Sequence, residues 1–377
     1  MQRRSRARWW FYVVVPCAVV LLTLAAVELA LRLVSPISHG VDRNMFFAPD
    51  PLTGYRIQPN SVGYFRDGII ARANSRGHRD DEVSLERRAR VPRVLILGDS
   101  FTVGASVLQE HAYPHVLQQL LREEYGTEVE VINTAVGGWD PFQYAQYFEH
   151  HGREFAPDLI LIGFFVGNDA YSPYRHVRHL PTAVGGRRLS QEGAEKLGVA
   201  FRVWLYERSH LWRLLSSPRG AAPGATVRRR DCADFSDRYL VVQRDRLKVH
   251  LAEKEPGIEE RLDLNVGQIE RIVDLATEDG TPVLVALFPD ENQLNPALRR
   301  RLLARRDASR YDFSWPQPAL AERLNAIGVE VLDLLPVFAS DPRCLFMNDT
   351  HWTEEGHVLV AETLRDWLKG RLGDGPP

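Results

Sequence analysis

The chain has 377 residues, of which 45% are hydrophobic, and its formal net charge is −2 at pH 7. This length and apolar content suffice for one large domain with its own core. A charge so close to zero disfavours nucleic acid and other polyanions as partners, so we expect a globular domain that binds no nucleic acid.

The N-terminal segment has the composition of a membrane anchor. An almost wholly apolar run extends from Trp9 to Val27. Four arginines precede it: Arg3, Arg4, Arg6 and Arg8. With its flanks the run is long enough to cross a bilayer, and arginines stay on the cytoplasmic side. We predict a cytoplasmic tail at residues 1–8 and a transmembrane signal anchor at residues 9–34. The C-terminal domain of this single-pass protein would lie outside the cytoplasm, in the periplasm or the extracellular space.

A cleaved signal peptide is the alternative to an anchor. The apolar run is longer than the usual signal-peptide core of about 7–15 residues, and no clear Ala-x-Ala site closes it. Of the three cysteines, Cys17 lies in this run, whereas Cys232 and Cys344 lie beyond it. In an oxidising compartment these two could form a disulfide, and the sequence leaves their proximity open.

Residues 35–89 are expected to form a β-rich collar that links the anchor to the main domain. They contain turn signals and two strand-like pieces, Gly54–Ile57 and Gly68–Ile70. The main domain is placed at residues 90–372, with an insertion at about residues 171–256. This insertion is either a cover for a site or a surface excursion without a catalytic part.

The main domain alternates short apolar runs with amphipathic segments. The runs expected as strands are Val94–Leu97, Val129–Ile132, Leu159–Phe164, Val283–Leu287 and Val329–Leu332. The segments expected as helices are Tyr113–Tyr125, Phe142–His151, Ile258–Glu278 and Leu320–Ile327, followed by a last helix with Leu359, Leu364, Trp367 and Leu368 on its core face. Continuous apolar strands are typical of burial on both faces. The alternation predicts an α/β fold with a doubly wound, five-stranded parallel sheet.

Four polar motifs follow these strands. They are Gly98-Asp99-Ser100, Gly137-Gly138, Gly167-Asn168-Asp169 and Asp349-Thr350-His351. Because ligands of such sheets bind beyond the carboxyl ends of the strands, we expect the four loops to meet at one edge. Each motif taken alone also has a purely structural interpretation, as a tight turn or a polar helix entrance.

Together the motifs supply the groups for serine-dependent acyl transfer. Ser100 ends a strand at a turn that can expose its hydroxyl as a nucleophile. Asp349 and His351 are two residues apart, which in an extended loop puts both side chains on one side, so the carboxylate can orient the imidazole base. The backbone N–H groups of Ser100 and Gly138, with the Asn168 amide, would form an oxyanion hole. His357 lies inside the last helix and is the weaker candidate for the base.

In combination and order the motifs resemble the SGNH (GDSL-like) hydrolases over roughly residues 90–370. The resemblance implies a flavodoxin-like SGNH fold, Ser100 as nucleophile, Asp349 with His351 as the acid–base pair, and Ser100, Gly138 and Asn168 as oxyanion donors. Gly138 has the family's usual spacing from Asn133.

Two features depart from the family pattern. The family commonly has its aspartate three residues before the histidine, where this chain has Asn348, and Gly167 directly adjoins Asn168 where the family has Gly-x-Asn-Asp. The Asp-Thr-His-Trp form of residues 349–352 is similar to that of the alginate-type O-acetyltransferases, which act on exported polysaccharide.

The expected function is that of a membrane-anchored extracytoplasmic serine esterase, working through an acyl-enzyme without a cofactor. It would remove or transfer small acyl groups, acetyl by analogy, on an exported glycan or another ester substrate, and a membrane protein could donate the acyl group. An inactive glycan-binding or scaffolding protein is the alternative, with Trp139, Trp315 and Trp352 stacking on sugars.

Metal-dependent catalysis is a further class of function to consider. Two pairs of histidines could act as metal ligands, His150 with His151 and His176 with His179. Because no HExxH motif or cysteine-rich ligand set accompanies them, we expect no metal site. Phosphate-binding and dinucleotide-binding glycine motifs are also missing from the sequence.

Overall fold

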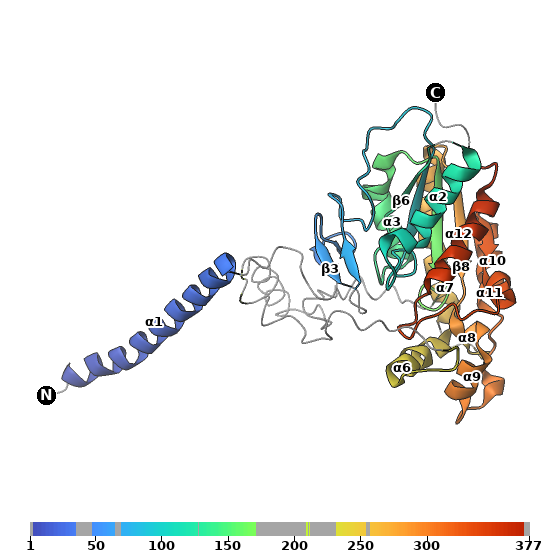
Figure 1. Ribbon diagram of the computed structural model, residues 1–377. Coiled ribbons are helices and arrows are strands. Elements are labelled where there is room, and N and C mark those ends of the chain that lie inside the picture. Colours follow the sequence, from blue (N-terminus) through green and yellow to red (C-terminus); the bar gives the residue numbers. More distant parts are fainter. Residues whose placement is uncertain are drawn as a thin grey trace.

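The computed structural model describes residues 3–34, 47–64, 69–126, 128–170, 209, 211, 231–253 and 257–372 (Figure 1). Its first helix, α1, spans Arg3–Val34. The segment Phe11–Leu33 has a mean hydropathy of 2.5 and none of it is buried. By length and composition this helix can cross a membrane, and a signal sequence near the N-terminus has the same properties. The apolar helix is therefore confirmed, and its role as an anchor stays a prediction.

Two antiparallel hairpins precede the main sheet. Strand β1 (Phe47–Asp50) pairs with β2 (Gly54–Ile57), and β3 (Val62–Tyr64) pairs with β4 (Ile70–Arg72). The strand expected at Gly54–Ile57 is confirmed. The second expected piece begins as a strand only at Ile70, and Gly68 lies outside the described residues.

The hairpins are hydrogen-bonded to the main domain through Tyr55. Its hydroxyl donates to the Gly137 carbonyl over 3.1 Å, and its own carbonyl accepts from the indole N–H of Trp139 over 3.0 Å. Hairpin β1–β2 is thereby fixed against the turn that contains Gly137 and Gly138.

The predicted five-stranded parallel sheet is confirmed. Its strand order is β6-β5-β7-β8-β9. The strands are β5 (Arg93–Gly98), β6 (Glu130–Asn133), β7 (Leu159–Phe165), β8 (Val283–Phe288) and β9 (Glu330–Asp333). Every residue of β5 and β7 is buried, whereas the edge strand β9 is partly exposed. The apolar runs in the sequence thus reflect burial of the central strands on both faces.

Helices cover both faces of the sheet (Figure 1). One apolar cluster joins the sheet to α3 (Pro141–His150), α7 (Ile258–Glu278) and α10 (Pro316–Ala326). A second cluster joins the other face to α2 (Tyr113–Tyr125) and α12 (Glu354–Leu368). Shorter helices are α6 (Asp237–Arg246), α8 (Glu291–Leu294), α9 (Pro296–Leu303) and α11 (Leu335–Ser340). Single 3₁₀ turns lie at Gln109–His111, Gly152–Phe155, Leu247–His250 and Ala308–Arg310.

The described part of the insertion is attached to the main domain. Tyr239, Leu240 and Leu247, from α6 and the turn after it, pack with Leu298 and Leu302 of α9. Cys232 and Cys344 form a disulfide, which answers the question that the sequence left open. Most of residues 171–230, including the Gly/Pro/Ala-rich stretch at Ser216–Ala225, lies outside the described residues.

Candidate active site

Ser100 lies in the turn that follows β5. The carbonyl groups of Asp99 and Ser100 accept hydrogen bonds from the N–H groups of Val103 and Ala105, over 2.9 and 3.0 Å. Two glycines, Gly98 and its register partner Gly163 on β7, make room for this turn. A Cβ atom at either glycine would overlap the Thr102 hydroxyl. The position of the Thr102 side chain therefore requires glycine at both positions.

The structure brings Ser100, His351 and Asp349 into one hydrogen-bonded series. His351 Nε2 lies 2.9 Å from Ser100 Oγ, and His351 Nδ1 lies 3.1 Å from Asp349 Oδ2. Asp349 Oδ1 also accepts from the His351 backbone N–H over 3.1 Å. Both carboxylate oxygens thus hold the histidine, which fixes the imidazole with Nε2 toward the serine.

The environment of Asp349 favours its ionised form. Burial opposes ionisation, but the charge of His351 and the hydrogen bonds from His351 and Ser106 outweigh that effect. They hold the pKa of the Asp349 carboxyl well below its usual range. A permanently charged carboxylate can stabilise an imidazolium on His351.

The backbone between Asp349 and His351 differs from the expected extended loop. Thr350 has a φ of +80° and its N–H donates to the Met347 carbonyl over 3.0 Å. The Met347 N–H in turn donates to the His351 carbonyl over 2.8 Å, and Phe346 and Trp352 form an antiparallel bridge. The expectation of an extended loop is therefore wrong, because a tight turn with a left-handed residue, rather than strand alternation, brings the two side chains together.

Ser106 is a neighbour of Asp349 that the sequence analysis did not single out. Its hydroxyl donates to Asp349 Oδ2. Arg79 holds the surrounding loop, since its guanidinium donates to the carbonyl groups of Val103, Gly104 and Val107 over 2.9, 2.5 and 2.6 Å. Arg79 is only 2% exposed. No motif in the sequence links residue 79 or 106 to residue 349, because the contact exists only once the loops are folded together.

Asn168 contacts the Ser100 turn through Asp99. Its amide nitrogen donates to Asp99 Oδ2 over 3.1 Å, and Asp99 Oδ1 accepts from the Phe101 N–H over 2.9 Å. Burial raises the pKa of the Asp99 carboxyl. Asp169 is also buried and accepts from Tyr144 and from the Phe165 N–H, which supports the loop around Asn168.

Gly138 lies beyond β6, at the edge of the sheet where β5 and β7 also end. It has a φ of +81°, and a Cβ there would come within 2.9 Å of the Tyr55 hydroxyl. The positive φ favours glycine here, and a side chain would also press on the Tyr55 hydroxyl. The structure thus places Ser100, Gly138 and Asn168 after three neighbouring strands, β5, β6 and β7, and their roles as oxyanion donors stay a prediction.

The sequence model of the GDSL-like Lipase/Acylhydrolase family matches residues 96–359. This chain belongs to that family. The matched range contains the loops of Ser100, Gly138, Asn168 and His351. Membership in the GDSL-like family supports an acylhydrolase-like or esterase-like function. No curated protein matches the chain.

Three solved structures are similar to this GDSL-like chain. The lipase Lip_vut3 from goat rumen metagenome is 16% identical, with a TM-score of 0.43, and the match covers 75% of this chain and 100% of that one. The acetyl xylan esterase AlAXEase is 14% identical, with a TM-score of 0.38 and coverages of 73% and 98%. The psychrotrophic esterase EstA from Pseudoalteromonas sp. is 12% identical, with a TM-score of 0.35 and coverages of 74% and 96%. At such values these similarities carry no argument about the substrate.

The insertion contributes Arg246 to this GDSL-like site. Arg246 Nη2 donates to Thr350 Oγ1 over 3.2 Å, and its guanidinium lies over the Phe165 ring, 4.8 Å from the centroid. A second nitrogen, Nη1, lies 3.6 Å from a carboxylate oxygen of the buried Asp290. Nothing in the sequence pattern indicates this residue, because it lies within the predicted insertion, away from the family motifs.

The remaining histidine candidates have other surroundings. His357 is buried in α12, its Nδ1 accepts from the Tyr113 N–H over 3.2 Å, and burial lowers its pKa to about 3. The contact to Ser100 Oγ is made by His351 instead. His150 Nδ1 lies 2.9 Å from the Gln146 carbonyl, and His176 and His179 lie outside the described residues. Among the described residues, no group of three or more His, Cys, Asp or Glu side chains is placed to hold a metal ion.

The tryptophans named as possible sugar platforms are mostly internal. Trp139 is 1% exposed and Trp352 is 0% exposed. The prediction that these two side chains stack on a glycan is therefore wrong. Trp315 is partly buried, and its indole N–H donates to the Val249 carbonyl over 2.7 Å. The glycan-binding alternative thereby loses two of its three named residues.

Proposed function

We propose that the chain is a serine ester hydrolase in which Ser100 is the nucleophile and His351 the general base, oriented by Asp349. The single observation that supports it best is the continuous contact from Asp349 through the His351 ring to the Ser100 hydroxyl. Membership of the GDSL-like family supports the same chemistry.

The reaction proceeds in two steps. His351 Nε2 accepts the Ser100 proton as Oγ attacks the ester carbonyl, and the tetrahedral intermediate collapses to an acyl-enzyme as the leaving alcohol takes that proton. The N–H groups of Ser100 and Gly138 stabilise the oxyanion, together with the second amide hydrogen of Asn168, whose first faces Asp99. Water, activated by His351, then releases the acid.

The finer proposal is that the enzyme acts outside the cytoplasm on small acyl groups of an exported glycan. The apolar helix α1 and the arginines at its start support a domain that is anchored to the membrane and lies outside the cytoplasm. The Asp-Thr-His-Trp motif supports acetyl as the acyl group and a sugar hydroxyl as an acceptor that competes with water. In the transfer reaction, a membrane protein would deliver the acyl donor.

A kinetic comparison tests the proposed hydrolysis. The full chain, purified in detergent, should hydrolyse p-nitrophenyl acetate, and Ser100→Ala should lower kcat by at least about 10³-fold. Ser309→Ala, on an exposed 3₁₀ turn, is the matched control and should leave kcat unchanged. Equal rates for Ser100→Ala and the unaltered protein would refute the assignment of the nucleophile.

A trapping experiment identifies the acyl group. Mass spectrometry of the intact protein after exposure to acetyl, butyryl and octanoyl esters should show an adduct on Ser100 that is largest for acetyl. Adding a deacetylated polysaccharide should then shift product from free acid to acetylated glycan if transfer occurs. Preferential trapping of octanoyl would contradict the small-acyl proposal.

A further inference from the structure

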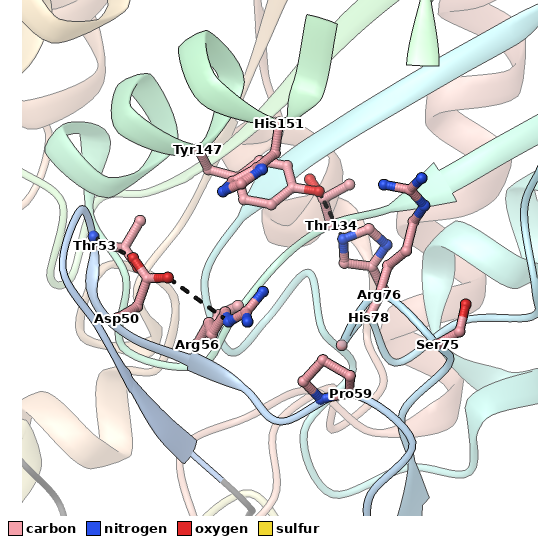
Figure 2. A pocket seen from close by; sticks show the side chains of 12 residues that line it. Asp50, Thr53, Arg56, Pro59, Ser75, Arg76, His78, Thr134, Tyr147 and His151 are labelled. Atoms are coloured by element: carbon pink, nitrogen blue, oxygen red, sulfur yellow. Dashed lines mark hydrogen bonds and ion pairs between the residues drawn. The ribbon is translucent and has the colours of Figure 1, made fainter. Parts of the chain in front are cut away.

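A cavity of about 440 Å³ lies between the N-terminal hairpins and the main domain (Figure 2). Hairpin β1–β2 lines it with Asp50, Thr53 and Arg56, and the turn after β4 lines it with Ser75–His78. The main domain contributes four further residues: Thr134, Val136, Tyr147 and His151. Its volume is within the range of small-molecule sites, about 300–1,000 Å³.

Two arginines from separate segments, Arg56 and Arg76, line this cavity (Figure 2). Arg56 Nε lies 3.6 Å from Asp50 Oδ2, and Arg76 Nη1 lies 3.5 Å from Glu154 Oε2. Both contacts are longer than the roughly 2.7–2.9 Å of a charge-assisted hydrogen bond, so each guanidinium keeps donors for another acceptor. Their side chains are 44% and 33% exposed, which leaves them accessible to a ligand.

The described residues that line the cavity include two arginines and one carboxylate, and the carboxylate partner of Arg76, Glu154, lies outside the lining. Asp50 is the one carboxylate among the described residues that line the cavity, and three donors from Leu52 and Thr53 already occupy its Oδ1. Burial, together with the charges of Arg76, His151 and Arg56, lowers the pKa of His78 to about 3. His78 therefore stays neutral, with its Nε2 2.6 Å from the Tyr147 hydroxyl.

We propose that this cavity binds the anionic group, a carboxylate or a phosphate, of a sugar-sized polar ligand, with Arg56 and Arg76 as its two charged anchors. Guanidinium groups pair with both kinds of anion through two parallel N–H donors. The ring of His151 lies in the same lining and can offer a polar contact to the remainder of a ligand. The Ser75 hydroxyl donates to Glu82 over 2.7 Å and can therefore only accept from a ligand.

The cavity lining is joined by one backbone hydrogen bond to the strand that precedes Ser100. The Val136 N–H donates to the Gly98 carbonyl over 3.2 Å, which joins the lining to the strand that ends before Ser100. Gly138 follows two residues later, in the turn fixed by Tyr55. The lining and the proposed oxyanion turn thus share one segment of chain, and anion binding in the cavity does not depend on the proposed chemistry of Ser100.

Calorimetric titration of the full chain in detergent tests the site. At low salt, D-glucuronate or glucose 6-phosphate should bind saturably, whereas neutral glucose should not, and the stronger of the two anions identifies the group. Arg56→Gln and Arg76→Gln should each weaken the binding of that anion by about tenfold or more. Arg72→Gln, an exposed arginine of β4 outside the cavity lining, is the matched control and should leave the affinity unchanged.

Further variants test anion binding independently of the proposed esterase activity. Ser100→Ala should bind the anion as tightly as the unaltered protein does. Loss of hydrolysis with retained anion binding would show that the two sites act independently. Arg56→Lys keeps the charge without the planar fork, and an intermediate affinity would support the site if Arg56→Gln fails to fold. The proposal is overturned if neither anion binds, if glucose binds equally well, or if Arg246→Gln abolishes binding while Arg56→Gln and Arg76→Gln do not.

Discussion

Asp349 accepts two side-chain hydrogen bonds on the same oxygen, one from the His351 ring and one from Ser106. Ser106 has a φ of +70°, a left-handed backbone conformation that costs a non-glycine residue about 1–2 kcal/mol. The fold keeps a strained serine whose hydroxyl contacts the carboxylate of the candidate triad. This combination indicates that the hydroxyl positions Asp349 for its contact with His351.

Two substitutions of Ser106 distinguish the effect of its hydroxyl from the effect of its backbone strain. We expect both Ser106→Ala and Ser106→Gly to lower kcat about tenfold with little change in KM, because a hydrogen bond to a charged group contributes roughly 1.5–3 kcal/mol. Ser106→Gly should be the more stable of the two by about 1 kcal/mol, since glycine adopts a positive φ without strain. Steady-state kinetics and urea unfolding measure these effects. An unchanged kcat in the glycine variant would show that the hydroxyl has no positioning role.

At the scale of elements, α12 is joined to the start of α2 by a buried histidine. His357 Nδ1 accepts the Tyr113 N–H, which lies in the first turn of α2 and has no partner within that helix. Burial lowers the pKa of His357 to about 3, below the usual 6.5. The folded protein therefore binds fewer protons at this site than the unfolded chain between about pH 3 and pH 6.5.

This difference predicts an acid-sensitive fold. The free energy of unfolding should fall as the pH is lowered from 6.5 toward 4, by roughly 1 kcal/mol per pH unit for His357. His357→Asn retains an acceptor for the Tyr113 N–H but does not titrate in this range, so its stability should depend less steeply on pH. Urea unfolding at pH 7, 6, 5 and 4 measures both slopes. Parallel slopes for the two proteins would contradict the shifted pKa.

The Cys232–Cys344 disulfide fixes the insertion near the candidate site. The bond closes a sequence separation of 112 residues, and α6 beyond Cys232 supplies the Arg246 contact to Thr350. We expect the double variant Cys232→Ser with Cys344→Ser to lower the free energy of unfolding by about 2–4 kcal/mol. Thermal unfolding under non-reducing conditions measures the loss. Cys17→Ser is the control, because Cys17 is unpaired, and it should behave as the unaltered protein does.

Sequence patterns predict some elements of this fold better than others. The five main strands could be located because burial on both faces imposes continuous apolar runs, as in Leu159–Phe165. The start of α10 was placed too late because Pro316 begins the helix and the expected apolar pattern starts only at Leu320. Strands β1 and β3 are not predicted, because β1 contains Pro49 and β3 contains Gly63, two residue types that strand patterns disfavour.

In the candidate site, too, some residues could be predicted from the sequence and others could not. Ser100 and His351 could be predicted because each stands in a motif next to a predicted strand or helix, and their contact follows from the sheet topology. Ser106 and Arg246 could not, since one reaches Asp349 through a strained loop and the other reaches Thr350 from the insertion. Such contacts depend on how loops that are distant in sequence pack together in the folded protein. A local sequence pattern does not determine that packing.

The whole molecule combines an apolar N-terminal helix with an enzyme domain, and the two alternatives for that helix make different predictions. If it is an anchor, the full chain should resist extraction from membranes by alkaline carbonate, and removal of residues 1–34 should release the protein. A reporter at the C-terminus should be active only outside the cytoplasm, because the arginine-rich start stays inside. N-terminal sequencing is the check, since a mature protein that starts beyond residue 34 would establish a cleaved signal peptide instead.

The two facing glycines beneath Thr102 have a consequence for how this lineage can diverge. A methyl group at Gly98 or Gly163 would collide with the Thr102 side chain, and Gly163 is also hemmed in by the Phe288 ring. Neither glycine can therefore be replaced by a larger residue without a second substitution. In an alignment of descendants, positions 98, 102 and 163 should covary as one unit, so that a larger residue at either glycine is found only where the threonine has been lost.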